Sequence, residues 1–302
     1  MFDPEIVLGI VSKAIKKNEV FGDLLSPQSI ASLAKDSLVR FVETGHILCQ
    51  QNQYDSTLFL LIDGEAEVST ETNHLKTSLG KLGAGELIGE IAALFQIPRI
   101  ATVTVTRPSV VLEIPADVFS ELLSQNQLLR DAVNKRSRTR VIETSLRCIP
   151  IFDGIGIQPF SELCYLSSLI KVNKHAVVVH EGAMEKSMYV ICSGTARVYI
   201  TVDGQEINIA MLRPGDFFGE YSFLTGEARS ASVSAATDLQ LVLLEGETFH
   251  SFLEYYDDVE GQIEMNMAKR KQSLNLLHDS LAARQTAEMR FKHFQEANIK
   301  RH

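Results

Sequence analysis

Short stretches in which apolar and polar residues alternate make up most of this chain. Residues 66–70 alternate with this period of two, which is typical of half-buried strands, and residues 38–42 and 58–62 are short, mainly apolar stretches of strand length. Gly with Asp or Asn separates such stretches, and Asp203-Gly204 between two of them predicts a tight hairpin. Many short strands divided by turn signals predict an all-β sandwich or barrel.

Helical patterns flank the strand-rich stretches. Pro4 suits the first turn of a helix at the N-terminus. A further helix is predicted to open at Pro115 and to place one apolar face at Val118, Leu122, Leu129 and Val133. Residues 245–302 contain almost no Gly or Pro and follow a helical pattern. The chain is therefore predicted to be mainly β with flanking α-helices and a long C-terminal helix.

The same pattern occurs twice, 130 positions apart. The segment GELIGEI at Gly85–Ile91 returns as GDFFGEY at Gly215–Tyr221. The spacing holds without a gap from Gly64 and its counterpart Gly194 onward, and a one-residue gap upstream aligns Phe21 with Phe152. Two long copies indicate a duplicated domain rather than a solenoid.

The duplication predicts the domain boundaries. We expect an N-terminal helix over residues 1–19, a first domain over 20–145, a second domain over 146–265 and a C-terminal helical extension over 266–302. Two domains of this size are usual for a chain of 302 residues.

The composition is that of a globular chain with an acidic balance. Hydrophobic residues make up 45%, and this apolar fraction excludes a disordered or collagen-like chain. The formal net charge is −9. An acidic chain does not bind nucleic acid through its net charge, so no DNA partner is expected. The stretch Ile6–Ile10 lacks a basic leader, and no apolar run approaches the roughly 18–20 residues of a membrane span.

The four cysteines give no sign of a metal or redox site. Cys49, Cys148, Cys164 and Cys192 form no CxxC pair and have no cluster of histidines beside them. They are predicted to be small buried hydrophobic residues in a reducing, cytoplasmic environment.

A short polar pattern in each copy has the chemistry of an anion site. A Gly-Glu pair is followed by an arginine nine residues after the glutamate, at Glu90 and Arg99 and again at Glu220 and Arg229. The glycine lets the backbone approach closely, and the arginine offers a planar fork to phosphate. An ionised glutamate only accepts hydrogen bonds, so it suits a hydroxyl donor. For one isolated copy, a structural Glu–Arg ion pair is the alternative.

These residues carry a family resemblance. The run from Ile88 to Val103, IGEIAALFQIPRIATV, resembles the phosphate-binding cassette of cyclic-nucleotide-binding domains. The run from Phe218 to Val233, FGEYSFLTGEARSASV, is similar and equally long. Such domains occur in regulatory subunits of cAMP-dependent kinase, catabolite-activator-type regulators and cyclic-nucleotide-gated channels. The resemblance covers about residues 20–140 and 150–280 and implies two eight-stranded β-rolls (jelly-roll-like, double-stranded β-helix) with helices before and after.

The resemblance also assigns roles to residues. It implies that Glu90 and Glu220 accept the ribose 2′-hydroxyl and that Arg99 and Arg229 pair the cyclic phosphate of cAMP or cGMP. The expected residues of the first site are Gly89, Glu90, Ile91, Ala92, Arg99, Ile100 and Ala101. Those of the second site are Gly219, Glu220, Tyr221, Ser222, Arg229, Ser230 and Ala231. No catalytic residue, metal or further cofactor is expected.

Base preference rests on one position in each copy. Ser230 follows its arginine with a hydroxyl, whereas Ile100 has none. In the family a hydroxyl there assists guanine recognition, so we expect the first site to select cAMP and the second to be more tolerant of cGMP. The sequence leaves undecided which residues cap the base. Candidates are residues 118–145 or the second domain for the first site, and Tyr255, Tyr256 or the following helix for the second.

The output of such a sensor is expected to be a protein partner. The apolar positions Leu253, Tyr256, Ile263, Met267, Leu274, Leu277, Leu281 and Phe291 follow a seven-residue repeat interrupted by charges. This seam either packs on its own domain or pairs with a second chain as a homodimer. The main interpretation is a non-catalytic cytoplasmic cyclic-nucleotide sensor. The alternative is a regulatory subunit that inhibits a catalytic chain such as a kinase. The N-terminal segment argues against it, because Lys16-Lys17-Asn18 is a poor substitute for the Arg-Arg pseudosubstrate pattern expected of such a subunit. A structural module with degenerate sites and an enzyme rank lower.

Overall fold

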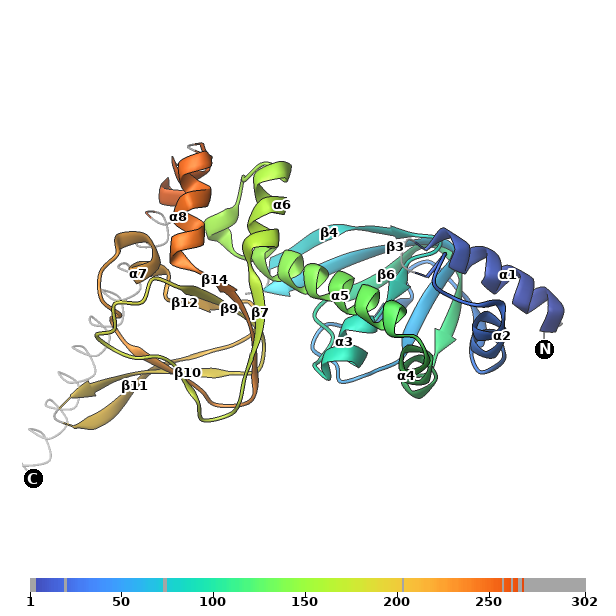
Figure 1. Cartoon of the computed structure of the whole chain (residues 1–302), viewed down its shortest axis with the longest axis horizontal. Coiled ribbons are helices and arrows are strands. Elements are labelled where there is room, and N and C mark those ends of the chain that lie inside the picture. The colour runs from blue at the N-terminus through green and yellow to red at the C-terminus, as the bar shows by residue number, and fades with distance from the viewer. Residues whose placement is uncertain are drawn as a thin grey trace, which may run out of the picture.

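Two strand-rich halves follow one another along the molecule, joined by the long helix α5 (Gln127–Arg147) (Figure 1). The computed structural model describes residues 4–18, 21–72, 75–202, 204–256, 258–261, 263–265 and 268. We call the strands β1–β6 roll A and the strands β7–β14 roll B.

The first half begins with helices and continues into roll A. Its elements are α1 (Pro4–Lys17), α2 (Pro27–Lys35), β1 (Leu38–Val42), β2 (Ile47–Cys49), β3 (Leu58–Thr72), β4 (Leu75–Gly83), β5 (Leu87–Ile88), α3 (Glu90–Phe95), β6 (Thr102–Ile114) and α4 (Ala116–Gln125). The strands form one sheet in the order β1-β6-β3-β4, with β2 paired to β6 and β5 to β3.

The second half repeats this plan after the short 3-10 helix η1 (Pro150–Phe152). Its elements are α6 (Ile157–Leu166), β7 (Ser168–Val172), β8 (Val177–Val179), β9 (Met188–Ser193), β10 (Ala196–Val202), β11 (Gln205–Leu212), β12 (Phe217–Phe218), α7 (Glu220–Thr225), β13 (Ser232–Ala235), β14 (Leu239–Leu244) and α8 (Gly246–Tyr255). The strands form two four-stranded sheets, β11-β10-β13-β8 and β12-β9-β14-β7.

The strand count explains how the two rolls correspond. Roll B has the expected eight strands, whereas roll A has six because β3 and β6, of 15 and 13 residues, are each continuous where roll B has two strands, β9 with β10 and β13 with β14. Gly64 marks the bend in β3, where the register on β6 shifts, and its φ of +117° would bring a Cβ against Ser109. The mainly β fold with flanking helices is therefore confirmed, whereas the closed barrel is wrong, because the described sheets of both halves stay open.

The helix predicted to run on from Pro115 is in fact two helices. α4 ends at Gln125 and α5 begins at Gln127, since Asn126 adopts extended angles. The Asn126 side chain accepts a hydrogen bond from the Leu129 amide at 3.0 Å and donates one to the Leu24 carbonyl at 2.8 Å. A capping asparagine thus starts a new helix in a new direction.

Helix α5 belongs to two hydrophobic cores. Leu129 and Val133 in its first half are buried with α1, α2 and roll A, whereas Val141 and Leu146 in its second half are buried with α6, α8 and roll B. A single helix therefore connects the packing of both halves.

The predicted hairpin is confirmed, since β10 and β11 pair antiparallel around Gly204, which has φ +76°. The C-terminal extension 266–302 lies outside the described residues except for position 268, as does most of the seven-residue seam. Within the described part of the chain, no helix combines the length and the apolar character needed to cross a bilayer.

Candidate functional site

Each copy of the Gly-Glu pattern forms a sharp strand-to-helix turn. In the first copy β5 ends at Ile88, Gly89 takes φ +88°, and α3 begins at Glu90. A Cβ on Gly89 would collide with the Arg99 guanidinium and lie 2.9 Å from the Thr57 carbonyl oxygen. Only glycine allows this approach of backbone and arginine, as the sequence predicts. We call residues 89–101 cassette A and the equivalent residues 219–231 cassette B.

Arg99 is held rigidly inside cassette A. It is 3% exposed, and its Nη1 donates to the Gly89 carbonyl at 2.9 Å. Its Nη2 donates to Asp55 Oδ2 at 2.8 Å and to the Thr57 carbonyl. Its Nε has no partner among the described residues. A buried donor without an acceptor is costly, so this nitrogen can gain from an added acceptor.

Asp55 balances the charge of this arginine. Burial acts to raise the pKa of Asp55, but hydrogen bonds from Thr57 and Arg99 outweigh it and lower the pKa below its usual value. Asp55 is therefore ionised at neutral pH and keeps the Arg99 fork oriented.

Glu90 lies on the other side of the same turn and is 4% exposed. Burial raises its pKa above the usual value, against the opposing effect of Arg140. Nη1 of Arg140, on helix α5, lies 3.2 Å from Glu90 Oε1, and Nη2 lies 2.5 Å from Glu86 Oε2. Arg136 pairs with Glu86 at 3.3 Å. Alternating charges thus fasten α5 to the cassette.

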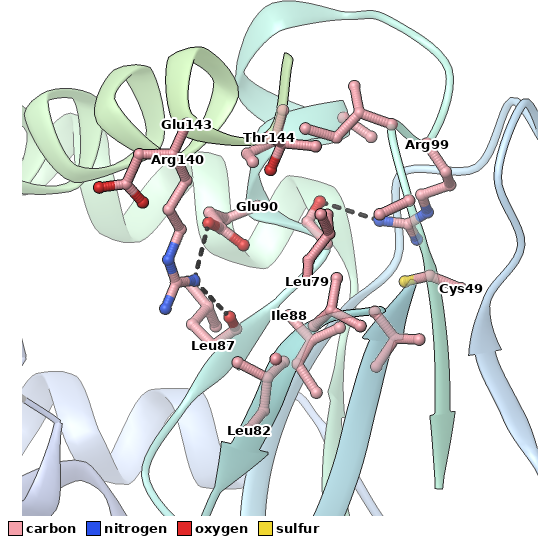
Figure 2. Close-up of a pocket in the computed structure, with 18 of the residues that line it drawn as sticks. Cys49, Leu79, Leu82, Leu87, Ile88, Glu90, Arg99, Arg140, Glu143 and Thr144 are labelled. Carbon is pink, nitrogen blue, oxygen red and sulfur yellow. Dashed lines mark hydrogen bonds and ion pairs between the residues drawn. The ribbon is translucent and has the colours of Figure 1, made fainter. Parts of the chain in front are cut away.

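A cavity of about 270 Å³ opens between cassette A and α5 (Figure 2). All seven residues predicted for the first site line it: Gly89, Glu90, Ile91, Ala92, Arg99, Ile100 and Ala101. Figure 2 shows Arg140, Glu143 and Thr144 projecting from α5 on one side, with Arg99 and Cys49 on the other. Leu79 and Leu82 of β4 add an apolar wall.

The cavity combines three kinds of surface. A rigid guanidinium offers donors to an anion, a buried carboxylate offers an acceptor to a hydroxyl, and the leucines of β4 offer apolar surface to a ring. This set fits a small ligand that carries an anion, a sugar hydroxyl and a flat ring. Among the described residues, no group of three or more His, Cys, Asp or Glu is placed to hold a metal.

Cassette B has the same turn with a different charge balance. Arg229 is 3% exposed, and it donates from Nη1 to the Gly219 carbonyl at 2.9 Å and from Nη2 to the Ser187 carbonyl at 2.6 Å. Its Nε also has no partner within the described ranges. Burial lowers the pKa of Arg229 below its usual value. The ion pairs found in the described part of the chain include none for Arg229, whereas Arg99 has Asp55.

The remaining residues predicted for the second site flank this arginine. Gly219 precedes α7, which begins with Glu220, Tyr221 and Ser222, and Arg229, Ser230 and Ala231 lead into β13. The Tyr221 hydroxyl donates to Glu227 at 2.9 Å, while Ser222 is buried and Ser230 exposed. Of the two tyrosines considered as caps, Tyr256 reaches α6, where its hydroxyl donates to Glu162 at 2.7 Å, and Tyr255 is largely exposed.

Sequence reasoning missed the partners that hold the two charged cassette residues. Asp55 lies 44 positions before Arg99, and Arg140 lies 50 positions after Glu90, so local patterns do not connect them. The duplication could have pointed to both partners, because the equivalent positions of the second copy keep the same charge: Glu185 corresponds to Asp55 and Arg270 to Arg140 at the spacing of 130.

Comparison with known proteins finds the same family of domain in both halves of the chain. A family model described as cyclic nucleotide-binding domain matches residues 39–126 and 169–256, together more than half of the chain. A cGMP-dependent protein kinase of Drosophila melanogaster is 24% identical over 234 residues, which cover 76% of this chain and 20% of that protein. A cAMP-dependent protein kinase regulatory subunit of Yarrowia lipolytica is 25% identical over 241 residues, covering 80% of this chain and 60% of the relative.

Solved structures also match over most of the chain. The regulatory domain of Toxoplasma gondii PKA, crystallised with cAMP, aligns with 90% of this chain and 99% of its own, at 20% identity and a TM-score of 0.41. The chain spans less than two thirds of the length of the first two relatives named above.

Proposed function

Because the chain belongs to the cyclic nucleotide-binding domain family, we propose that it is a non-catalytic sensor that binds cAMP, or cGMP, in cassettes A and B. Arg99 and Arg229 pair the cyclic phosphate, and Glu90 and Glu220 accept the ribose 2′-hydroxyl. The backbone around Ile91, Ala92 and Ala101, and around Tyr221, Ser222 and Ala231, completes the two phosphate contacts.

One observation carries this proposal. In both cassettes a nearly fully buried arginine is fixed by the carbonyl of the cassette glycine, and its Nε is left without an acceptor among the described residues. A buried, oriented guanidinium with an unused donor is suited to an oxyanion. In cassette A the arginine, the glutamate and an apolar wall line one cavity, which supports a nucleotide rather than a simple anion.

We propose that α5 forms one wall of the first site and transmits its occupancy. Thr144 and Glu143 line the cavity, and Arg140 holds Glu90, so a ribose that shares Glu90 competes with this ion pair. The same helix is buried in both cores. A ligand that shifts α5 therefore alters the surface presented to a protein partner, to the extent that it binds the two arrangements with different affinity.

An apolar Ile100 in cassette A and a hydroxyl at Ser230 in cassette B favour cAMP selection in the first site.

Calorimetric titration of the full chain with cAMP and cGMP tests the proposal. We expect two equivalents to bind, and Arg99→Ala or Arg229→Ala to remove one each. Each variant loses about two hydrogen bonds to a charged group, about 3 kcal/mol or 100-fold in affinity. Exposed Arg107→Ala and Arg213→Ala are matched controls and should bind as the unaltered chain does. Absence of heat with both nucleotides, in protein shown by mass spectrometry to be free of nucleotide, would contradict the proposal.

A second function is supported by the relative from Yarrowia lipolytica, which is named as a kinase regulatory subunit and matches 80% of this chain. We propose that the protein partner is a kinase catalytic chain whose release depends on the nucleotide. Purified catalytic subunit of a cAMP-dependent protein kinase, assayed with and without the chain, tests this. Inhibition relieved by cAMP is expected, and unchanged kinase activity at equimolar chain would contradict it.

A further inference from the structure

Helices α6 and α8 lie side by side (Figure 1), and both carry exposed aromatic side chains. Tyr165 on α6 is 87% exposed, and Tyr255 at the end of α8 is 77% exposed. The ring of Tyr255 meets that of Tyr256 edge-on with centroids 4.9 Å apart, and Tyr256 reaches across to Glu162 of α6. Tyr165 follows Glu162 by three positions, which places both on one side of the helix. We call Glu162, Tyr165, Tyr255, Tyr256 and Asp258 the tyrosine face.

The duplication offers an internal comparison for these aromatic positions. Helix α2 matches α6 at the spacing of 130, since the buried Ile30 and Leu33 correspond to the buried Phe160 and Leu163. At the same spacing, the exposed position of Tyr165 is occupied in the first half by a lysine.

Helix α8 shows the same difference at its end. The first half has exposed Gln125 at the position of Tyr255. Asn126, at the position of Tyr256, donates to the Leu24 carbonyl and so links the last helix of that half to the segment before α2. The Tyr256–Glu162 bond makes the corresponding link in the second half. The first half thus builds the same helices with polar residues at these surface positions, so Tyr165 and Tyr255 are exposed beyond what the packing of the described helices requires.

The charge around the tyrosine face is negative. Glu162, Glu254 and Asp258 are exposed, and none of them takes part in the ion pairs found in the described part of the chain. The hydrogen bond to Glu162 raises the pKa of Tyr256 to about 12, with smaller contributions from desolvation and from the nearby negative charges. Two copies of this face would bring like charges together, which disfavours a second copy of this chain as its partner.

We propose that the tyrosine face docks a basic segment of a partner protein, with arginine or lysine side chains against the rings of Tyr165 and Tyr255 and beside the carboxylates. Tyrosine rings attract cations through their π faces, and arginine also stacks on them. Carboxylates at the rim supply charge complementarity and speed encounter. None of the five residues of this face belongs to cassette A or cassette B, and the test below uses the chain without nucleotide.

Fluorine NMR of the full chain labelled with 3-fluorotyrosine tests the proposal. The chain has seven tyrosines, whose signals single Tyr→Phe variants assign. The probe is hexa-arginine amide, titrated at about 0.15 M salt, where long-range attraction is screened. We expect saturable shifts at Tyr165, Tyr255 and Tyr256 and none at Tyr54, an equally exposed tyrosine of the first half at 84%.

Variants separate aromatic docking from general attraction to an acidic chain. Tyr165→Ala with Tyr255→Ala should weaken binding about fivefold, the equivalent of about 1 kcal/mol for an exposed cation–π contact. Tyr54→Ala should leave binding unchanged. Equal shifts at Tyr54, no shift at millimolar peptide, or unaltered affinity of the double variant would each overturn the proposal. Shifts of the same signals on dilution without peptide would assign the face to a second copy and overturn it as well.

Discussion

Removing Arg140 should destabilise the first half of the molecule through the charge it leaves behind. Glu90 is 4% exposed, and among the described residues its cation is Arg140 at 3.2 Å. Arg140→Ala removes this partner while the carboxylate stays buried. Breaking a pair in this way costs more than the pair itself contributes, because an uncompensated charge remains.

The structure sets the size of the effect. Glu90 loses one hydrogen bond to a charged group, about 1.5–3 kcal/mol. Glu86, the other partner of Arg140, keeps Arg136 at 3.3 Å, so little is added from that side. Since the Arg140 side chain is a quarter exposed, solvent screens part of the interaction. We expect about 2 kcal/mol at pH 7.5, a fall in melting temperature of roughly 4–8 °C.

The loss should grow with pH. Burial raises the pKa of Glu90 above the ordinary value of 4.5, and removing Arg140 raises it further. In the interval between 4.5 and the raised pKa, the folded chain holds a proton that the unfolded chain releases. Stability therefore falls as pH rises through that interval, and the variant loses more than the unaltered chain. The difference between the two should be smallest near pH 5.

Urea unfolding followed by far-UV circular dichroism at pH 5 and pH 7.5 measures this difference, and hydrogen exchange of the peptide spanning residues 86–95 locates it. Arg138→Ala, an exposed arginine on the same helix, is the matched control and should cost less than about 0.5 kcal/mol. Adding Glu90→Gln to Arg140→Ala should restore part of the stability at pH 7.5. An Arg140→Ala variant that resembles the control, or a loss that neither pH 5 nor Glu90→Gln relieves, would refute the reasoning.

Three further predictions concern the cassettes and the cysteines. Gly89→Ala should abolish nucleotide binding at the first site and cost at least about 1 kcal/mol of stability, because φ is +88° and the added Cβ meets Arg99; titration and melting check both, and full binding would be contrary to the geometry. Ser230→Ala should lower the ratio of cGMP to cAMP affinity at the second site, measured in the Arg99→Ala background, and an unchanged ratio would exclude a role for this hydroxyl. Burial raises the pKa of Cys164 and of Cys192 to about 12. Brief treatment of the native chain with iodoacetamide at pH 8 should therefore label the partly exposed Cys148 first. Equal labelling of all three cysteines, measured by peptide mass spectrometry, would contradict the burial of Cys164 and Cys192.

Periodicity and duplication along the chain predicted the strand-rich halves, and the resemblance to the phosphate-binding cassette of cyclic-nucleotide-binding domains identified both cassettes. Alternation of period two is a local property of each strand, and Gly-Glu with arginine nine residues later is a local property of each turn. Because the spacing of 130 repeats these features together, it marked the same turn at Gly89 and Gly219. All seven residues predicted for the first site line one cavity, although their roles toward a nucleotide stay predictions.

Local pattern was insufficient wherever a helix or strand continued or stopped for tertiary reasons. The apolar positions Leu122 and Leu129 predicted one helix. Asn126 ends it, because its side chain caps the N-terminus of α5 and donates a hydrogen bond to the Leu24 carbonyl. In roll A, β3 runs on through a glycine bend that in roll B separates β9 from β10, a difference of register that alternation does not record.

What the sequence by itself determined is the position of each cassette, because each is one contiguous run of residues whose resemblance to the family's cassette is visible without the fold. Only the tertiary structure decided how the two cassettes differ. Arg99 meets Asp55 from a loop 44 positions away, whereas Arg229 is fixed by backbone carbonyls, and Glu90 is neutralised by Arg140 on a helix that belongs to both cores. Charges act through space with a strength set by distance and burial, and neither quantity exists until the chain is folded.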